Sequence, residues 1–346
     1  MANSMKAVVK TRPEYGAELK EVPVPDPASG QVLVKIQRLS ICGSDLHIYK
    51  WNNWAEQNVN LPQIMGHEMA GEVVALGEGV TSVEVGDFVS AETHIPCGQC
   101  YQCKTGLQHI CVNMKILGVH TDGVFADYAV IEEVDVWKND PAIPARYASI
   151  QEPLGNAIDT IRAGEVAAKN VLITGAGPAG LLAIPVANAL GAATVIVTEP
   201  NDYRRDLAEK MGADFAINPL EEDLEALVAE VTDGVGVDFV AEMSGAAAAI
   251  KQGLKQITPG GRIALLGVPD GPVEIDLSPD LIFKGIDMIG VTGREMFQTW
   301  FIARRLLKEE KIDIEPVITH EFPLEDFAKG MELMEPGNCG KIVLKP

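Results

Sequence analysis

The feature that most constrains the fold of this 346-residue chain is an uncharged stretch that runs from residue 170 to residue 198. A stretch of that length could cross a membrane as a helix. However, glycines and prolines interrupt it throughout, and both its ends, 171–173 and 195–197, are rich in β-branched residues, as in buried strands. The stretch therefore predicts a strand, a glycine-rich turn, a helix and a second strand, within a parallel sheet covered on both faces.

The turn inside this stretch has the spacing of a nucleotide-binding motif. Gly175, Gly177 and Gly180 fit the pattern G-x-G-x-x-G, which lets the backbone approach a pyrophosphate at the start of a helix. Glu199 ends the next predicted strand, where an acid binds the ribose hydroxyls of a dinucleotide. A carboxylate there repels a 2′-phosphate, so NAD is favoured over NADP, although two arginines that follow leave NADP open. The alternative is a structural turn in a sheet without nucleotide.

The rhythm of predicted elements changes along the chain. Up to about residue 150, short strand candidates such as 32–36 and 85–89 are separated by glycine and proline turns, as in a barrel-like β domain. From about 160 to 293, strands and helices alternate, which indicates a doubly wound parallel sheet. We therefore predict an α/β protein in which a nucleotide-binding domain interrupts a β-rich domain. The predicted boundaries are 1–155 and 294–346 for the β-rich domain and 156–293 for the inserted domain.

Four of the six cysteines fall within one short loop. Cys97, Cys100, Cys103 and Cys111 have a spacing that suits a tetrahedral zinc ion with no free coordination position. Such a closed site is structural, because a substrate cannot reach the metal. We predict a structural zinc lobe at about residues 94–115. An iron–sulfur cluster and a loop of reduced cysteines are the alternatives.

Charge and composition exclude several classes of function. The net charge of −21 argues against proteins that coat DNA or RNA and against a zinc ribbon for nucleic acid, because phosphate binding needs clustered cations. It also disfavours docking on anionic membranes. The N-terminal residues lack the basic-then-apolar pattern of an export signal. We therefore expect a cytoplasmic protein without nucleic-acid or membrane partners, in which clustered cysteines bind metal rather than form disulfides.

A second, open metal site is predicted from three separate segments. Cys42, His67 and the carboxylates Glu68 and Glu152 could together build a mixed sulfur, nitrogen and oxygen zinc site of the catalytic type. Adjacent residues on a regular strand point to opposite faces. His67 and Glu68 can therefore reach one metal only if the backbone is irregular there, or if Glu152 exchanges with Glu68.

These motifs together resemble the zinc-dependent medium-chain alcohol dehydrogenases over essentially the whole chain. The strings that carry the resemblance are Cys42-Gly43-Ser44-Asp45, Gly66-His67-Glu68, Val85-Gly86-Asp87, the four-cysteine lobe and the glycine turn. The resemblance implies a GroES-like catalytic domain, a Rossmann NAD-binding domain, one catalytic and one structural zinc per chain, and a homotetramer. Longer strings, at 41–49, 92–95, 151–157 and 293–297, are similar to the members that oxidise the secondary hydroxyl of L-threonine to 2-amino-3-oxobutyrate.

The resemblance also implies roles for individual residues. Cys42, His67 and Glu68 fall on the catalytic-zinc positions, and Glu152 falls on a nearby position for an alternative ligand or a participant in proton relay. Ser44 and His47 match the proton-relay pair. Arg294 is a candidate for the substrate carboxylate, with a cofactor or interdomain contact as the alternative. The residues on cofactor-contacting positions are Ala179, Glu199, Arg204, Leu266, Gly267, Val268, Val291 and Thr292.

Two other functions remain open at this point. The first is a dehydrogenase of the same family that acts on a polyol or a vicinal diol, such as sorbitol or 2,3-butanediol. The second is a non-catalytic protein that binds NAD or zinc on the same scaffold. The retained Cys42, Ser44, His47 and His67 oppose the second, because a binding module needs no open metal site with a proton relay.

Overall fold

The computed structural model describes residues 3–346; residues 1 and 2, which the predicted β-rich domain includes, lie outside the described part. The chain forms two compact units, and it passes from the first to the second within helix α5 (Gln151–Ala163). One unit holds the chain up to Glu152 together with Ile318–Pro346, and the other holds Pro153–Val317. Residues 294–317 thus share a compact unit with the nucleotide-type sheet. The functional boundary at residue 294 stays a prediction, because a compact unit need not coincide with a functional domain.

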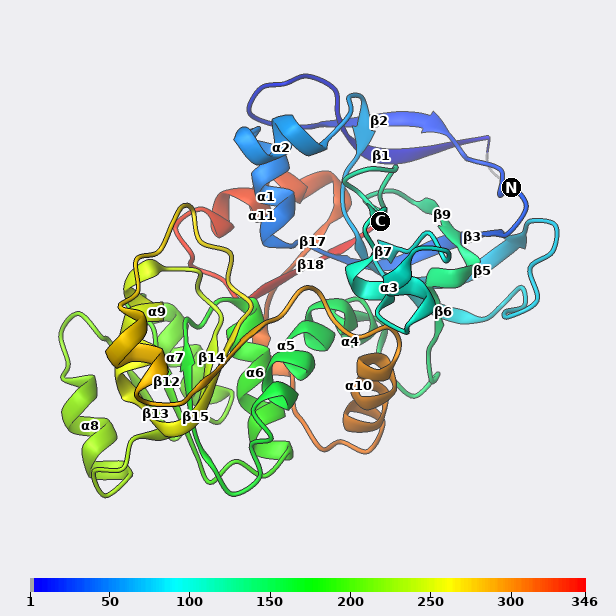
Figure 1. Cartoon of the computed structure of the whole chain (residues 1–346). Helices are drawn as coiled ribbons and strands as arrows, with labels where there is room; N and C mark the ends of the chain where they lie inside the picture. Colours follow the sequence, from blue (N-terminus) through cyan, green and yellow to red (C-terminus); the bar gives the residue numbers. More distant parts are fainter. Residues whose placement is uncertain (1–2) are drawn as a thin grey trace. The chain divides into compact units, whose positions relative to one another are not determined.

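The first unit is built mainly from strands, as the sequence predicts (Figure 1). Its strands are β1 (Ser4–Lys10), β2 (Glu18–Pro23), β3 (Gln31–Ser40), β4 (Gln63–Ile64), β5 (Glu68–Leu76), β6 (Phe88–Ala91), β7 (His94–Ile95), β8 (Lys115–Ile116), β9 (Tyr128–Glu132), β10 (Val136–Lys138), β17 (Ile318–Pro323) and β18 (Lys341–Lys345). Its helices are α1 (Gly43–Lys50), α2 (Asn53–Asn58), α3 (Tyr101–Lys104), α4 (Ala145–Ala148) and α11 (Phe327–Met334).

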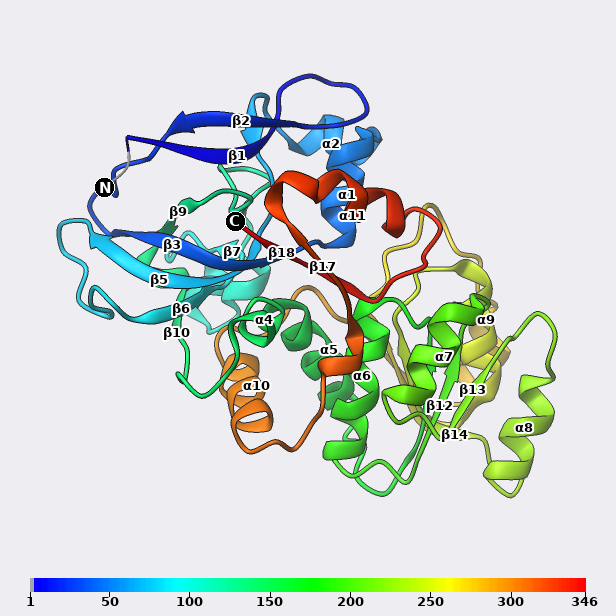
Figure 2. The ribbon, with the colours of Figure 1, turned by 180° about the vertical axis from the view of Figure 1, so that it is seen from behind.

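The largest sheet of this unit brings the end of the chain back to its beginning. Its strand order is β10-β6-β5-β3-β18-β17, and β9 also pairs with β3. Strand β18 therefore lies next to β3, as Figure 2 shows together with the packing of α11 on β17. A core of buried side chains, among them Leu39, Met69 and Leu344, holds these strands together. The C-terminal strand is thereby placed beside the segments that carry Cys42 and Glu68.

One predicted strand of this unit is wrong in its first half. Residues 85–89 were expected to be extended, but the strand begins only at Phe88. The Asp87 carboxylate accepts a hydrogen bond from the Glu84 backbone nitrogen at 2.9 Å, and Gly86 has a φ of +96°. These contacts close a turn, so Val85 is exposed to solvent instead of facing the core.

The second unit contains the parallel sheet that the uncharged stretch predicts. Its strand order is β13-β12-β11-β14-β15-β16, with every neighbouring pair parallel. The predicted sequence of strand, turn, helix and strand is confirmed as β11, α6 and β12. The elements of this unit beyond α5 are β11 (Asn170–Thr174), α6 (Pro178–Ala189), β12 (Thr194–Thr198), α7 (Asp202–Lys210), β13 (Phe215–Ile217), α8 (Leu224–Val231), β14 (Val237–Glu242), α9 (Ala247–Gln256), β15 (Ile257–Leu265), β16 (Asp287–Gly290) and α10 (Gln298–Lys308).

The residues of the uncharged stretch are buried because the sheet is covered by helices. Leu172 and Ile196 belong to the core of the unit and are fully buried. Helices α6, α7 and α9 contact the strands beside which they run. Within residues 3–346, every helix is too short or too polar to span a bilayer.

Candidate metal and nucleotide sites

The three predicted catalytic-zinc ligands lie together in the first unit. One ligand atom each from Cys42, His67 and Glu68 can be chosen so that all three lie within 4.8 Å of one another. Cys42 is the residue before helix α1, and Glu68 is the first residue of strand β5. Glu152 is not one of this set, although its carboxylate is also buried nearby and accepts a hydrogen bond from Thr93 Oγ1 at 3.3 Å.

The backbone before β5 explains how two adjacent residues reach one point. His67 lies outside the strand, and Gly66 before it has a φ of +85°. A Cβ at Gly66 would stand 2.0 Å from Phe125 Cδ1, so only glycine fits there. Because the regular alternation of side chains starts only at Glu68, the expected irregularity is present and both side chains turn to the same place.

The electrostatics of this cluster suit a cation. Glu68 Oε1 is buried without a hydrogen-bond partner among the described residues, while Oε2 accepts hydrogen bonds from Ser40 and Lys341. Burial, first of all, and the neighbouring Glu152 carboxylate raise the pKa of Glu68 against the effect of Lys341. Burial disfavours the charged form of His67, but the Asp45 carboxylate and the Cys42 thiol raise its pKa overall. A thiol, an imidazole and a partly unpartnered carboxylate are the donors that zinc takes.

Two residues that sequence reasoning missed support the ligand set from behind. The Asp45 carboxylate accepts a hydrogen bond from the Cys42 backbone nitrogen at 2.9 Å and lies 3.6 Å from His67 Nδ1. Nδ1 then faces the carboxylate and Nε2 is left for a metal, which is the usual arrangement behind a metal-bound histidine. The spacing of Asp45 three residues after Cys42 is the signal in the sequence that could have identified it.

The second missed residue, Lys341, had no signal in its local sequence. Its ammonium group is buried, forms an ion pair with Glu68 and donates a hydrogen bond to the carbonyl of Ile41 at 2.8 Å. Burial lowers the pKa of Lys341, but the Glu68 carboxylate and the Cys42 thiol outweigh this effect and raise it. The two partners are 273 positions apart in the chain, so only the pairing of β18 with β3 brings them together.

The predicted relay residues lie on helix α1. Ser44 and His47 are three residues apart, a spacing that places them on one face of the helix. His47 is exposed, and its Nδ1 lies 2.9 Å from Asn52 Nδ2. Helix α1, which begins directly after Cys42, therefore carries the Ser44 hydroxyl and the His47 imidazole within five residues of that predicted ligand.

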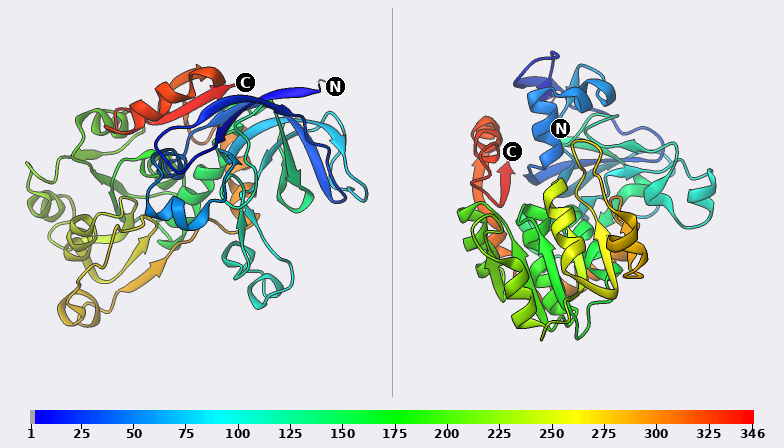
Figure 3. Two further views of the ribbon diagram at one scale, coloured as in Figure 1. Left: turned by 90° about the horizontal axis from the view of Figure 1, so that it is seen from above. Right: turned by 60° about the vertical axis from the view of Figure 1, so that its left-hand side comes forward.

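The four cysteines of the lobe also converge. All four sulfurs lie within 4.8 Å of one another, and Cys100 Sγ is 3.4 Å from Cys103 Sγ and 3.7 Å from Cys111 Sγ. Tetrahedral zinc with bonds of about 2.3 Å places its sulfurs about 3.8 Å apart. Figure 3 shows this segment, in teal, standing out from its unit in both views.

The thiols of the lobe need a cation to ionise together. Hydrogen bonds from the backbone of Gln99 and Cys100 lower the pKa of Cys97 to about 6. Burial, with the neighbouring sulfurs, raises the pKa of Cys103 to about 12. The backbone nitrogens of Cys97 and Asn113 both donate to Cys111 Sγ at 3.3 Å, as expected where sulfur carries negative charge.

A pocket of about 510 Å³ in the second unit collects several predicted cofactor residues. Gly175, Gly177, Glu199 and Arg204 line it, together with Leu220 and Ser244. The Glu199 carboxylate accepts a hydrogen bond from the Ala176 backbone nitrogen at 2.8 Å, so it also fixes the glycine turn. Arg205, the other arginine that follows Glu199, donates instead to the carbonyls of Glu199 and Pro200.

The other predicted cofactor residues follow the carboxyl ends of neighbouring strands or begin α6. Leu266, Gly267 and Val268 come directly after β15, and Val291 and Thr292 come directly after β16. In doubly wound sheets, ligands bind at this edge. Ala179 and Gly180 lie in the first turn of α6, where a Cβ on Gly180 would stand 2.0 Å from the Gly175 carbonyl oxygen.

Arg294 is enclosed within its own unit. Its side chain is fully buried, donates a hydrogen bond to Asn156 Oδ1 at 2.9 Å and lies 5.9 Å from the Trp300 ring centroid. A Cβ on Gly155 would stand 2.5 Å from Arg294 Cδ, so glycine makes room for it. These contacts give Arg294 a role in packing, and its contact with substrate stays a prediction.

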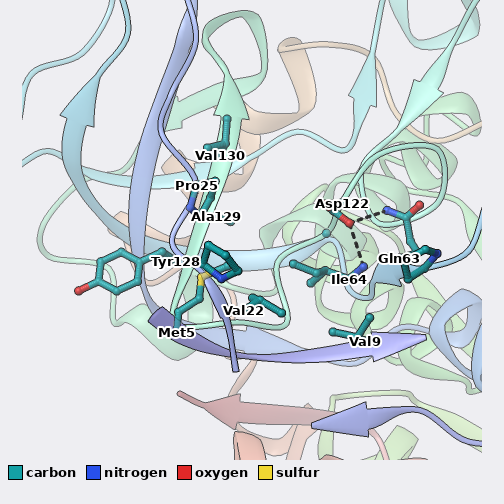
Figure 4. A pocket seen from close by; sticks show the side chains of 13 residues that line it. Met5, Val9, Val22, Pro25, Gln63, Ile64, Asp122, Tyr128, Ala129 and Val130 are labelled. Atoms are coloured by element: carbon teal, nitrogen blue, oxygen red, sulfur yellow. Dashed lines mark hydrogen bonds between the residues drawn. The ribbon is translucent and has the colours of Figure 1, made fainter. Parts of the chain in front are cut away.

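A further pocket, of about 350 Å³, lies in the first unit among residues that the sequence did not single out (Figure 4). It is mostly apolar and includes Val9, Val22 and Tyr128. The one acid in it, Asp122, is engaged by the Ile64 backbone nitrogen at 3.0 Å and by the Gln63 amide. None of its lining residues belongs to the predicted site.

Comparisons with known proteins agree with this arrangement. Residues 28–144 match the alcohol dehydrogenase GroES-like domain, and residues 178–309 match the zinc-binding dehydrogenases. The chain is 56% identical to the L-threonine 3-dehydrogenase of Pyrococcus furiosus over 344 residues, which cover 99% of each chain.

Solved structures share the fold at lower identity. An alcohol dehydrogenase of E. coli CFT073 in complex with NADH is 30% identical, with a TM-score of 0.91 and full coverage of both chains. The 2R,3R-butanediol dehydrogenase of Bacillus subtilis is 27% identical, with a TM-score of 0.89, 99% coverage of this chain and 100% of that one. This chain therefore belongs to the zinc-binding alcohol dehydrogenase family.

Proposed function

We propose that this chain is a zinc- and NAD-dependent L-threonine 3-dehydrogenase, which oxidises the secondary hydroxyl of L-threonine to 2-amino-3-oxobutyrate. The observation that carries the proposal is the convergence of Cys42, His67 and Glu68 from separate segments on one point. The high identity to a relative of that activity, against 27% to a butanediol dehydrogenase, supports threonine over a vicinal diol. A non-catalytic binding protein would have no use for an open ligand set beside a hydroxyl and an imidazole.

Cys42, His67 and Glu68 hold the catalytic zinc in this proposal. When bound, zinc would lower the pKa of the substrate hydroxyl, and NAD would take up the hydride from the carbon that carries this hydroxyl. Asp45 and Lys341 hold the ligands in place from behind. Glu152, which is buried nearby, takes part in proton relay or exchanges with Glu68. The four cysteines of the lobe hold the structural zinc.

Ser44 and His47 move the proton that the alcohol loses. The Ser44 hydroxyl would accept this proton and hand it on toward His47. His47 is exposed, so its ring can release the proton to water. Serine suffices for this step, because the relay uses only a hydroxyl oxygen. The additional methyl group of a threonine would play no part in it.

The second unit binds the cofactor in this proposal. Gly175, Gly177 and Gly180 admit the pyrophosphate, and Glu199 binds the ribose hydroxyls and excludes a 2′-phosphate. Arg204 contributes to the same pocket, and Ala179, 266–268 and 291–292 complete the contacts. Arg294 acts on the substrate carboxylate, directly or through the residues that it positions.

A substrate panel tests the function. NADH formation is measured with L-threonine, sorbitol and 2,3-butanediol, and NADP replaces NAD in a parallel series. We expect the highest kcat/KM for L-threonine with NAD. A higher value for either of the other two alcohols would contradict the proposal.

A variant of the metal site tests the mechanism. Cys42→Ser is expected to abolish turnover and to reduce the zinc content from two ions per chain to one, while circular dichroism stays unchanged. Full turnover by this variant would show that Cys42 is not a zinc ligand.

We also propose that the protein is a cytoplasmic homotetramer. All six cysteines are free thiols, as expected in a reducing compartment. Strand β16 lies at the edge of the parallel sheet, and the segment leading into it exposes the apolar side chains of Leu277, Ile282 and Phe283. An exposed sheet edge with apolar side chains favours pairing with another chain.

A further inference from the structure

The last residue of strand β1, Lys10, has a fully buried side chain that reaches the end of helix α1. Its Nζ donates hydrogen bonds to the carbonyl of Gly16 at 2.7 Å, to that of Tyr49 at 2.9 Å, and to that of Glu14. The ring centroid of Trp51 lies 5.5 Å from the same nitrogen, as in a cation–π contact. Three carbonyl oxygens and an aromatic face therefore surround this ammonium group.

The ammonium group of Lys10 suits this place only when it is charged. Burial, which the Glu14 carboxylate opposes, lowers the pKa of Lys10 to about 8, so the group is mostly protonated at pH 7. Only the protonated group has three hydrogens for three acceptors. Tyr49 lies in the last turn of α1, where carbonyls lack partners within the helix and a positive charge is favourable. Lys10 therefore stabilises the end of this helix.

The backbone of Lys10 holds a second part of the candidate site. Lys10 pairs with Gln63 in strand β4, and the Met65 backbone nitrogen donates to the Val8 carbonyl at 3.1 Å. His67 follows Met65 by two positions. Strand β1 thus fixes the segment that leads to a predicted zinc ligand, while the side chain at its end holds the helix with the two relay residues.

We propose that Lys10 is a positioning residue for proton transfer: its ammonium group fixes helix α1, which carries both relay residues, relative to His67. The inference rests on the proposed function. Burying a charge costs free energy, and an apolar side chain would fill the same space without that cost. Proton transfer, by contrast, depends on small differences in distance, so a helix held in one place favours it.

A matched pair of substitutions separates positioning from stability. Lys10→Met keeps a long apolar side chain and removes all three donors. Lys284→Met is the control, because Lys284 Nζ also donates to three carbonyls at a helix end. Those carbonyls belong to Leu254, Lys255 and Ile257, at the end of α9 in the other unit, at 2.6, 3.0 and 3.2 Å. Both variants lose an equivalent set of hydrogen bonds, but only one of them lies beside α1.

Turnover of L-threonine with NAD is measured at pH 7 in H₂O and in D₂O. For Lys10→Met we expect kcat to fall about two- to tenfold, with an unchanged KM for NAD and a larger solvent isotope effect on kcat, because proton transfer becomes slower. The isotope effect is a ratio within one preparation, so loss of folded protein does not alter it. Lys284→Met is expected to change neither quantity. An unchanged kcat in Lys10→Met, or a lower kcat with an unchanged isotope effect, would overturn the positioning role.

Amide hydrogen exchange of the full-length protein tests the contact without substrate. Residues 43–50 are expected to exchange faster in Lys10→Met and at the original rate in Lys284→Met; an original rate in both would overturn the proposal. If Lys10→Met does not fold, Lys10→Gln, which keeps an amide donor, takes its place in both experiments. If the unsubstituted protein does not oxidise L-threonine, the proposed function fails, whereas the exchange rates still decide whether Lys10 fixes α1.

Discussion

Lys341 and Glu68 form a buried pair whose partners are nearly fully removed from solvent. Such ion pairs add little to folding stability compared with a well-packed apolar pair. A buried charge that is left without its partner, however, destabilises the folded state strongly. Lys341 also donates to the Ile41 carbonyl, immediately before Cys42. Lys341 thus links strand β18 to two predicted zinc ligands. It contacts Glu68 directly, and it holds the residue that precedes Cys42.

Removal of the ammonium group is therefore expected to destabilise the protein strongly. Lys341→Met leaves the Glu68 carboxylate unpaired, and we expect the free energy of unfolding to fall by about 3–5 kcal/mol in metal-free protein. Urea denaturation followed by circular dichroism measures this change. The double variant Glu68→Gln with Lys341→Met removes both charges and is expected to recover part of the loss. A double variant as unstable as the single one would contradict the role of the ion pair.

At the scale of elements, the glycine turn between β11 and α6 separates structural from functional glycines. A Cβ on Gly180 would stand 2.0 Å from the Gly175 carbonyl, whereas a Cβ on Gly177 meets nothing within 4 Å. Gly177 also has an ordinary φ of −64°. The fold therefore has no steric need for glycine at position 177. We expect glycine there because a side chain would obstruct a bound pyrophosphate.

Two alanine variants of this turn are expected to fail in different ways. Gly177→Ala leaves the free energy of unfolding within about 0.5 kcal/mol and raises the Kd for NAD about tenfold or more. Gly180→Ala is expected to cost about 1–3 kcal/mol of stability through overpacking. Calorimetric titration with NAD and urea denaturation give the two quantities. Unchanged NAD affinity in Gly177→Ala would favour the structural interpretation of the turn.

The cysteine lobe depends on its metal rather than on a core. Its segment exposes Tyr101 and Val112 to solvent, so few apolar contacts hold the loop together. Cys103→Ser is expected to reduce the zinc content from two ions per chain to one and to make the lobe sensitive to protease. Cys339→Ser is the control, because Cys339 lies outside the cluster and should leave both ions in place. Two retained ions in Cys103→Ser would refute the four-thiolate site.

At the scale of the whole molecule, the edge strand β16 tests the proposed assembly. Met288 lies on this strand and is 36% exposed. A lysine there places charge where a second chain would pair, so Met288→Lys is expected to yield a smaller assembly without loss of fold. Sedimentation velocity measures the mass. Val85→Lys, in an exposed turn of the other unit, is the control. An unchanged mass for Met288→Lys would place the interface elsewhere.

Short-range spacing made a large part of this molecule predictable. The glycine turn, the helix after it and the cysteine lobe each depend on residues within about twenty positions of one another, so their backbone geometry follows from local sequence. Boundaries were less certain: the predicted strand at 85–89 begins only at Phe88, because the Asp87 side chain closes a turn that periodicity cannot reveal.

The sequence by itself determined the class of fold, the cluster of four cysteines and the glycine turn, because these depend on residue type and on spacing along one segment. The tertiary structure alone decided that Glu68 joins Cys42 and His67 while Glu152 stands apart, that Lys341 neutralises Glu68, and that Arg294 is enclosed beside Asn156. Each of these depends on the pairing of distant strands or the packing of distant side chains. Such contacts are selected by burial and by charge in three dimensions, and no local pattern encodes them.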